Sequence, residues 1–395
     1  MNLILITILF CLLQGLDDII ETEKCAFRKE NKKGVISMKL KAQEISSVFS
    51  AMSKLSFAKK NTKDIEELNS VSLTARNGCM QVVFTNNLIS AAYKIEGVDG
   101  DFQYVADNNT VTSCISACVD ANGEFEFLMK QGVLYATGYA FVPIKTAPAK
   151  SKKFTCIKKD CGISIVASDL VNAIASTSIA VGQDSDVLQS VSLDFDTAEM
   201  QFKMTAFSGK MMAQANIPVE DMDEDNIIPH ILINGKVLMA VAPLLSLAKS
   251  KIIDIAFGDG AVMFSCDNIK VVVPCNTGEF VQCEKLLDKN YSQYVTFDTK
   301  ELKNQVKKMY KAVKTNIAFS SEGNNPLFSN EGFQMPANIV STNGVTFELP
   351  INLLKTVVEN VKWDNIQVSV ADGMLVKVSE EDADIITYVT SVSKK

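Results

Sequence analysis

Residues 346–378 read TFELPINLLKTVVENVKWDNIQVSVADGMLVKV, and their periodicities predict one compact structural repeat. A short strand precedes an amphipathic helix, in which apolar residues recur at helical spacing from Ile351 to Val361. Two segments of alternating apolar residues follow, separated by Asp372-Gly373, a pair that favours a tight hairpin turn. With a last strand over residues 385–392, the repeat has the order β-α-β-β-β.

The same order occurs at residues 230–274, again with an Asp-Gly pair, Asp259-Gly260, between two alternating segments. Here we expect strands at 231–233, 252–257, 261–265 and 270–273, and a helix at 236–249. Two further copies share the strand sequence Ser-Val-Ser-Leu at 70–73 and 190–193. Each follows a predicted helix, at residues 42–55 and 168–179.

Two weaker copies complete the set. Residues 102–144 contain a predicted helix at 109–119, and residues 294–347 contain one at 299–313. Six repeats group into three domains at 38–150, 151–288 and 289–395, with 145–153 as the first linker. The acidic segment 221–225 is expected to be a solvated loop. The predicted fold class is α+β, with helices on one face and sheets on the other.

The chain has no recognisable catalytic or metal-binding motif. Its ten cysteines form no Cys-x-x-Cys pair, and the single histidine, His230, leaves no second imidazole for a zinc site. Adjacent carboxylates such as Glu380-Glu381 lie in predicted turns without a companion base. Neither a phosphate-binding P-loop nor a dinucleotide-binding glycine motif occurs. We therefore expect no enzyme activity, no cofactor and no metal.

Positive charge is concentrated on the predicted helices. Residues 299–314 alone carry a net charge of +5, whereas the whole chain carries -7. Lysine is a good helix former, so solvated helix faces explain part of this distribution. If the six repeats form one layer, however, their helices line a single basic surface. Such a surface binds the phosphates of nucleic acid without reading their sequence.

The six β-α-β-β-β repeats resemble the bacterial DNA polymerase III beta subunit, the sliding clamp family, over residues 38–395. The clearest match is Lys362-Trp363-Asp364-Asn365-Ile366 with the C-terminal strand. The resemblance implies a processivity factor whose head-to-tail homodimer encircles double-stranded DNA, with helices inside and sheets outside. The lysines expected in the channel are Lys54, Lys59, Lys60, Lys236, Lys249, Lys251, Lys303, Lys307, Lys311, Lys314 and Lys355.

The resemblance also implies a pocket between the second and third domains that binds peptides of the DNA polymerase and the clamp loader. The family's pocket segments fall on residues that retain little beyond Gly209, which puts the peptide preference in doubt. Core packing is the alternative role for Met211 and Met212. The expected pocket residues are Leu188, Phe207, Gly209, Lys210, Met211, Met212, Val281, Lys285, Leu286, Leu353, Val376, Val389, Thr390, Ser391 and Val392.

Residues 1–37 lie outside the repeats. The apolar run at 3–13 is too short to span a bilayer and has no basic residue before it. Three interpretations remain: Met38 is the true start, residues 1–16 are a signal or anchor, or the segment is a genuine extension. We expect a cytoplasmic protein without membrane contact. The alternative is a secreted or surface-anchored repeat-β binding protein that uses residues 1–16 as a signal.

Overall fold

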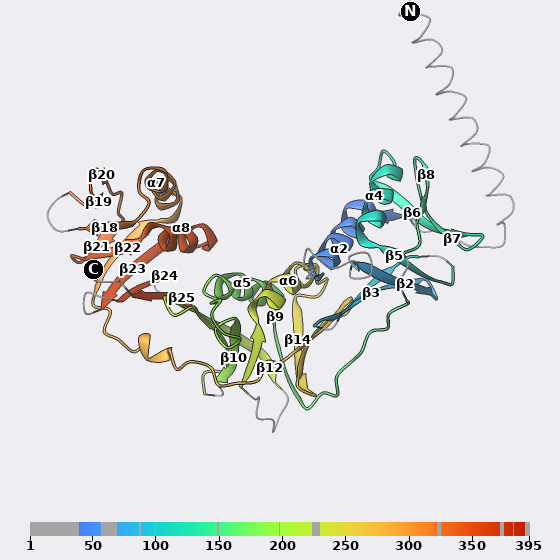
Figure 1. Ribbon diagram of the computed structural model, residues 1–395, viewed down its shortest axis with the longest axis horizontal. Helices are drawn as coiled ribbons and strands as arrows, with labels where there is room; N and C mark the ends of the chain where they lie inside the picture. Colours follow the sequence, from blue (N-terminus) through green and yellow to red (C-terminus); the bar gives the residue numbers. More distant parts are fainter. Residues whose placement is uncertain are drawn as a thin grey trace, which may run out of the picture. The chain divides into compact units, whose positions relative to one another are not determined.

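The structure is a computed structural model (Figure 1), and it describes residues 39–56, 69–86, 88–98, 100–147, 150–196, 198–222, 230–321, 325–371, 375–381 and 383–391. The expected start at Met38, the apolar run at 3–13 and the channel lysines Lys59 and Lys60 lie outside these residues. The chain divides into two compact lobes. The N-terminal lobe extends to Thr155 and includes 267–271, and the C-terminal lobe contains 156–266 and 272–395.

The N-terminal lobe holds the first two repeats. Repeat 1 consists of β1 (Leu40–Lys41), α2 (Ala42–Lys54), β2 (Ser70–Arg76), β3 (Cys79–Thr85) and β4 (Ser90–Glu96). Repeat 2 consists of β5 (Phe102–Asp107), α4 (Asn108–Cys118), β6 (Glu124–Lys130), β7 (Val133–Thr137) and β8 (Phe141–Ile144). The weak copy expected at 102–144 therefore has all five elements.

Repeats 3 and 4 follow along the chain. Repeat 3 consists of β9 (Cys161–Val166), α5 (Ala167–Ser178), β10 (Ser190–Asp196), β11 (Gln201–Phe207) and β12 (Met211–Met222). Repeat 4 consists of β13 (Ile231–Asn234), α6 (Gly235–Leu245), β14 (Ile252–Gly258), β15 (Ala261–Ser265) and β16 (Ile269–Pro274).

Repeats 5 and 6 come after a one-turn helix, η1 (Glu284–Leu286). Repeat 5 consists of β17 (Gln293–Asp298), α7 (Thr299–Ala312), β18 (Asn316–Ser320), β19 (Leu327–Asn330), β20 (Phe333–Pro336) and the short β21 (Ser341–Thr342). Repeat 6 consists of β22 (Thr346–Pro350), α8 (Ile351–Asn360), β23 (Asn365–Ala371), β24 (Leu375–Glu380) and β25 (Ala383–Ser391).

Consecutive repeats exchange their first strands. The first strand of each repeat pairs antiparallel with the second strand of its neighbour, as β1–β6, β5–β2, β9–β14, β13–β10, β17–β23 and β22–β18. The two helices of each pair also contact each other, as α2–α4, α5–α6 and α7–α8. Because neither repeat completes its sheet alone, the pair is the smallest unit that satisfies its backbone hydrogen bonds.

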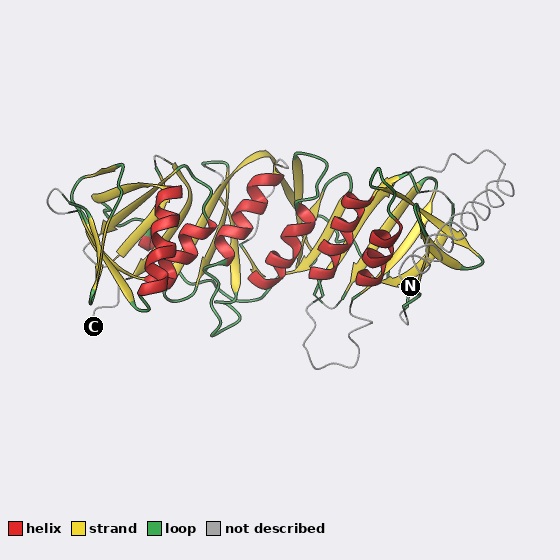
Figure 2. Ribbon diagram, turned by 90° about the horizontal axis from the view of Figure 1, so that it is seen from above, coloured by secondary structure: helices red, strands yellow, loops and turns green. Residues whose placement is uncertain are grey.

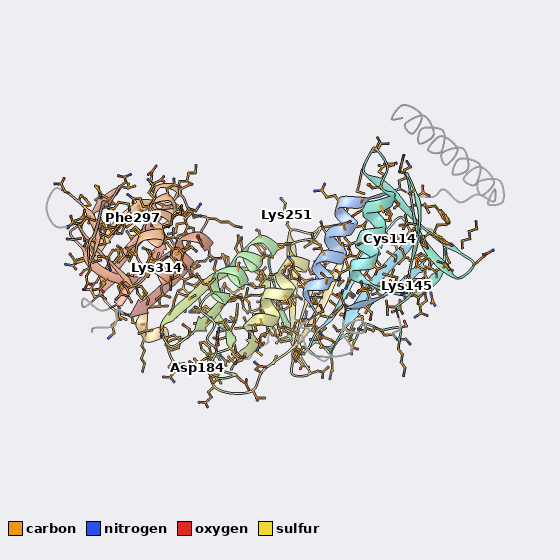
Figure 3. The ribbon with its side chains drawn as sticks, turned by 45° about the horizontal axis from the view of Figure 1, so that its top comes forward. Cys114, Lys145, Asp184, Lys251, Phe297 and Lys314 are labelled. Atoms are coloured by element: carbon orange, nitrogen blue, oxygen red, sulfur yellow. The ribbon has the colours of Figure 1, made fainter. Side chains whose placement is uncertain are left out.

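In each lobe the helices cover one face of the sheets, which Figure 2 shows with the helices in red over the strands. The third pair of repeats shows how the core forms beneath them. Phe297, labelled in Figure 3, packs its ring against Phe319 at 5.4 Å and Phe328 at 5.8 Å between centroids. All three side chains are fully buried. Full burial of an aromatic side chain of this size contributes about 1.5–3 kcal/mol.

The hairpin expected at Asp259-Gly260 is confirmed. Both residues have positive φ angles, 51° and 68°, and Gly258 pairs with Ala261. Positive φ at both central residues is the requirement of a type I′ turn, whose twist matches that of the flanking strands.

Two sequence-based boundaries are wrong. The helix expected at 236–249 ends at Leu245, because the amide of Leu247 bonds to the carbonyl of Leu244 and tightens the last turn. The first two residues of the loop expected at 221–225 belong to a strand instead. Asp221 and Met222 belong to β12, whose end pairs with β9 through Asp221 and Ser164. Residues 223–225 lie outside the described residues.

Candidate functional site

The first candidate surface is the exposed face of α7. Asp298 begins this helix by accepting a hydrogen bond from the amide of Glu301, and Leu302, Val306 and Met309 bury its opposite face. The lysines left exposed on α7 and directly after it are Lys300, Lys307, Lys308, Lys311 and Lys314. This side of the helix therefore offers a row of ammonium groups to an anionic ligand.

Lys303 has a different environment from these lysines. Its side chain is half-buried, and its Nζ donates a hydrogen bond of 2.7 Å to the carbonyl oxygen of Val361. Val361 is the residue that ends α8. Lys303 therefore joins α7 to α8, and its ammonium group is already engaged within the chain.

The other predicted channel lysines that the structure describes are spread over several elements. Lys54 ends α2, and Lys236 lies in the first turn of α6. Lys249 and Lys251 follow α6, and all four side chains are exposed. Lys355 lies on α8 beside Glu359, at 3.8 Å. The densest positive charge is thus on α7, whereas α5 contains Asp169 and no basic residue.

The second candidate surface lies in the C-terminal lobe, at the pairing of β12 with β25. β12 pairs antiparallel with β25, with Met211 opposite Thr390 and Ala213 opposite Tyr388. The hairpin before β12 turns at Gly209, which has a φ angle of +83°. Thr390 Oγ1 donates a hydrogen bond of 3.0 Å to the carbonyl of Lys210, and this bond fastens the hairpin to β25.

One face of this strand pair carries an apolar cluster, which we call the junction cluster. Its buried centre consists of Met212, Cys283 and Val389. Around this centre pack the half-buried side chains of Phe207, Phe280, Leu286, Leu287, Tyr291 and Leu375. Four of the predicted pocket residues, Phe207, Met212, Leu286 and Val389, are therefore brought into one cluster.

The segment 275–292, which we call the connector, supplies most of the rim of this cluster. At its start, the backbone amide of Asn276 donates a hydrogen bond of 2.7 Å to the carbonyl oxygen of Leu232. Near its end the hydroxyl of Tyr291 donates to the carbonyl of Leu286 at 2.6 Å, and burial raises the pKa of Tyr291 to about 12. The exposed Lys285 places a positive charge beside the apolar rim.

The remaining predicted pocket residues lie elsewhere or at the margin. Leu188 lies against Gly182, and Val281 is exposed on the connector. Leu353 is half-buried on α8, and Val376 is fully buried in β24. Successive strand residues face opposite sides, so Leu375 rather than Val376 faces the junction cluster. Ser391 ends β25, and Val392 lies outside the described residues.

Sequence reasoning missed five members of the junction cluster: Phe280, Cys283, Leu287, Tyr291 and Leu375. The sequence of the connector contains a signal that could have identified them. Two aromatic residues, Phe280 and Tyr291, occur there in a segment without strand or helix periodicity. Large apolar side chains in such a segment indicate that it packs onto the body of the protein.

His230 is placed next to acidic and hydroxyl side chains, but not in the geometry of a hydrolase. Its Nδ1 contacts Asp194 Oδ1, while Ser192 Oγ donates to Asp194 Oδ2 at 2.6 Å. In a catalytic triad the serine faces the other ring nitrogen and is activated by it. Here Ser192 lies 3.5 Å from the same Nδ1 and is bonded to the carboxylate. The arrangement therefore does not activate Ser192.

The described residues contain no group of three or more His, Cys, Asp or Glu side chains that could hold a metal ion. Among the helices described, none is both long enough and apolar enough to cross a membrane.

Six strand-exchanged repeats with helices on one face of their sheets define the DNA-clamp fold, and solved structures match this chain over most of its length. The DNA polymerase III beta subunit of Thermotoga maritima has a TM-score of 0.73 at 15% identity, covering 90% of this chain and 99% of that chain. The beta subunit of Streptococcus pyogenes has a TM-score of 0.73 at 14% identity, covering 90% and 99%.

A Pseudomonas aeruginosa sliding clamp bound to griselimycin also matches, with a TM-score of 0.72 at 15% identity, covering 91% of this chain and 99% of that chain. The chain thus has the fold of the DNA polymerase III beta subunits, with a strongly divergent sequence. No model of a known protein family matches it, and no curated protein sequence does either.

Proposed function

We propose that this chain is a DNA sliding clamp, a processivity factor that encircles duplex DNA and acts by tethering rather than by chemistry. The observation that carries the proposal is the complete set of six strand-exchanged repeats, with the fold of the beta subunits. In this proposal the pairs of repeats are three domains, at 38–150, 151–288 and 289–395.

Ring closure by two copies follows from the sheet edges. The last strands of repeats 3 and 6, β12 and β25, pair with each other inside the chain. β8, the last strand of repeat 2, and β20 of repeat 5 each lie at the edge of a sheet and have no strand partner on the outer side among the described residues. An unpaired strand edge is a template for pairing with another chain. We propose that β8 of one copy pairs with β20 of a second copy, head to tail.

Aromatic side chains support this assignment of the β8 edge. Tyr139 is 68% exposed and Phe141 38% exposed, and the Phe141 ring stacks on Tyr135 at 4.2 Å between centroids. Exposed aromatic groups are enriched at the centres of protein interfaces because they bury a large area with few rotatable bonds. Two such contacts related by a two-fold axis would close a homodimeric ring.

Duplex DNA is the ligand proposed for the helix faces. The exposed lysines of α7 concentrate positive charge on a chain whose net charge is -7, and phosphate contacts of this kind are independent of sequence. Polymerase and clamp loader are the partners proposed for the junction cluster. A short extended peptide with apolar anchors fits an apolar rim beside Lys285, and it can be exchanged quickly.

The test is whether the protein is linked to DNA topologically. Purified protein is incubated with nicked circular DNA, separated by gel filtration, and then treated with a restriction enzyme. A ring is retained on the circle and released when the DNA becomes linear. Equal retention before and after cutting, or a chain that remains monomeric at every concentration, would contradict the proposal.

A further inference from the structure

One aromatic ring on the α7–α8 face holds two ammonium groups. The Nζ of Lys355 in α8 lies 4.1 Å from the ring centroid of Tyr310, and the Nζ of Lys314 lies 5.1 Å from it. Lys314 Nζ also donates a hydrogen bond of 3.1 Å to the carbonyl of Tyr310. Lys314, labelled in Figure 3, follows the C-terminal end of α7 at Ala312. Two cations from different elements therefore share one half-buried tyrosine.

The charges around this ring favour an anionic ligand. Lys307 and Lys311, three residues before and one residue after Tyr310 on α7, are exposed. The acidic side chain paired with these groups is Glu359, 3.8 Å from Lys355. Because this carboxylate is paired with Lys355, while Lys314 shares the ring and Lys307 and Lys311 lie along α7, the cluster keeps a net positive charge.

Holding the cations in place matters for binding. A lysine side chain loses rotamer entropy when it is fixed. The negative face of an aromatic ring attracts an ammonium group and restricts where it goes. The two lysine side chains have therefore lost part of their rotamer entropy before a ligand binds, and the remaining ammonium protons can donate hydrogen bonds to phosphate oxygens.

We infer that Tyr310, Lys314 and Lys355 form a binding site for a phosphodiester group of duplex DNA, with Tyr310 as the positioning residue for both ammonium groups. This inference rests on the proposed clamp function and adds to it. It places a defined DNA contact in the third domain. It also predicts little contribution from α5, which has no basic residue.

The test uses the full chain and a short fluorescein-labelled duplex, with binding followed by fluorescence anisotropy at several salt concentrations. Lys355→Met should weaken binding several-fold and lower the slope of log K against log salt by about 1, the value for one lost phosphate contact. Tyr310→Leu should weaken binding about as much, whereas Tyr310→Phe, which keeps the ring, should bind like the wild type. Lys270→Met, which removes an exposed lysine of β16 that is not among the expected channel lysines, is the matched control and should leave binding near the wild-type value.

Four results would overturn the inference: wild-type binding by Tyr310→Leu, wild-type binding by Lys355→Met, loss of binding by Tyr310→Phe, or a loss in Lys270→Met equal to that in Lys355→Met. Inorganic pyrophosphate is tested in parallel. If Tyr310→Leu weakens pyrophosphate binding and leaves duplex binding unchanged, the site belongs to a free phosphate and the DNA assignment is wrong. Failure of the wild-type chain to bind duplex at any salt concentration would instead reject the proposed function itself. Unfolding curves of Tyr310→Leu, compared with those of Lys355→Met, separate a folding defect from lost binding.

Discussion

The Nζ of Lys303 in α7 donates a 2.7 Å hydrogen bond to the carbonyl oxygen of Val361 at the end of α8. This bond satisfies a carbonyl that has no partner within its own helix. It also places a positive charge at the negative end of the helix dipole. Lys303 thus stabilises the pairing of α7 with α8, whereas the other lysines of α7 are exposed to solvent.

We expect Lys303→Met to lower the free energy of unfolding by about 1 kcal/mol, the usual cost of losing one such bond. Lys307→Met, on the exposed side of the same helix, should change it by less than about 0.5 kcal/mol. Urea denaturation followed by circular dichroism measures both. DNA binding should show the reverse order, with the larger loss in Lys307→Met. Equal stability of the two variants would contradict a structural role for Lys303.

At the β8 edge, Phe141→Asp should prevent self-association. A carboxylate at an edge strand opposes pairing with a second chain, and loss of the ring removes apolar area from the proposed interface. Because Phe141 is 38% exposed, the fold should be retained. Sedimentation velocity measures the effect. Met200→Asp, which alters a similarly exposed apolar residue at 40%, is the control and should associate like the wild type. A dimer of unchanged affinity in Phe141→Asp would place the interface elsewhere.

The junction cluster should bind partner peptides, and Leu286→Asp should abolish that binding. A charge in an apolar rim costs several kcal/mol unless it is paired, so an apolar anchor can no longer dock beside it. Extended peptides selected on the wild-type chain are titrated by calorimetry. Val340→Asp, at a site that is 57% exposed, should bind these peptides normally. If Leu286→Asp also binds them normally, the cluster is only a packing contact between the connector and the sheets.

Alkaline pH should loosen the connector through Tyr291. Burial raises the pKa of this phenol from an ordinary 10.0 to about 12, because the phenolate is poorly solvated there. Ionisation is therefore easier in the unfolded chain. The stability that the neutral phenol contributes is complete below pH 10 and is lost as the pH rises through about 12.

Tyr291→Phe lacks the ionisable group and should lose less stability over this pH range than the wild type. The measurement is the urea midpoint of both chains at several pH values from about 9 to 11.5. Tyr388, whose pKa is also raised by burial to about 12, remains in both chains and cancels in the comparison. Parallel pH profiles of the two chains would show that Tyr291 is not buried enough to matter.

Much of the fold could be predicted because its signals are local. The helical spacing from Ile351 to Val361 and the turn at Asp259-Gly260 depend on neighbouring residues only, and both elements are present. The site was predicted less completely. Phe207, Met212, Leu286 and Val389 share one cluster, and Phe280, Cys283, Leu287, Tyr291 and Leu375, which pack with them, were not among the residues named from sequence. Irregular backbone carries no periodicity that shows which side chains turn inward.

The sequence by itself determined the six repeats, their order of elements and the concentration of lysine on α7, because these follow from residue spacing and charge. The tertiary structure alone decided which strands pair and which lysines are available. Repeats exchange first strands across dozens of residues, as β17 with β23, and no local preference specifies such a partner. Lys303 and Lys307 look alike on one helix, yet packing against the end of α8 engages only the first. A contact of that kind exists only after distant segments have folded together.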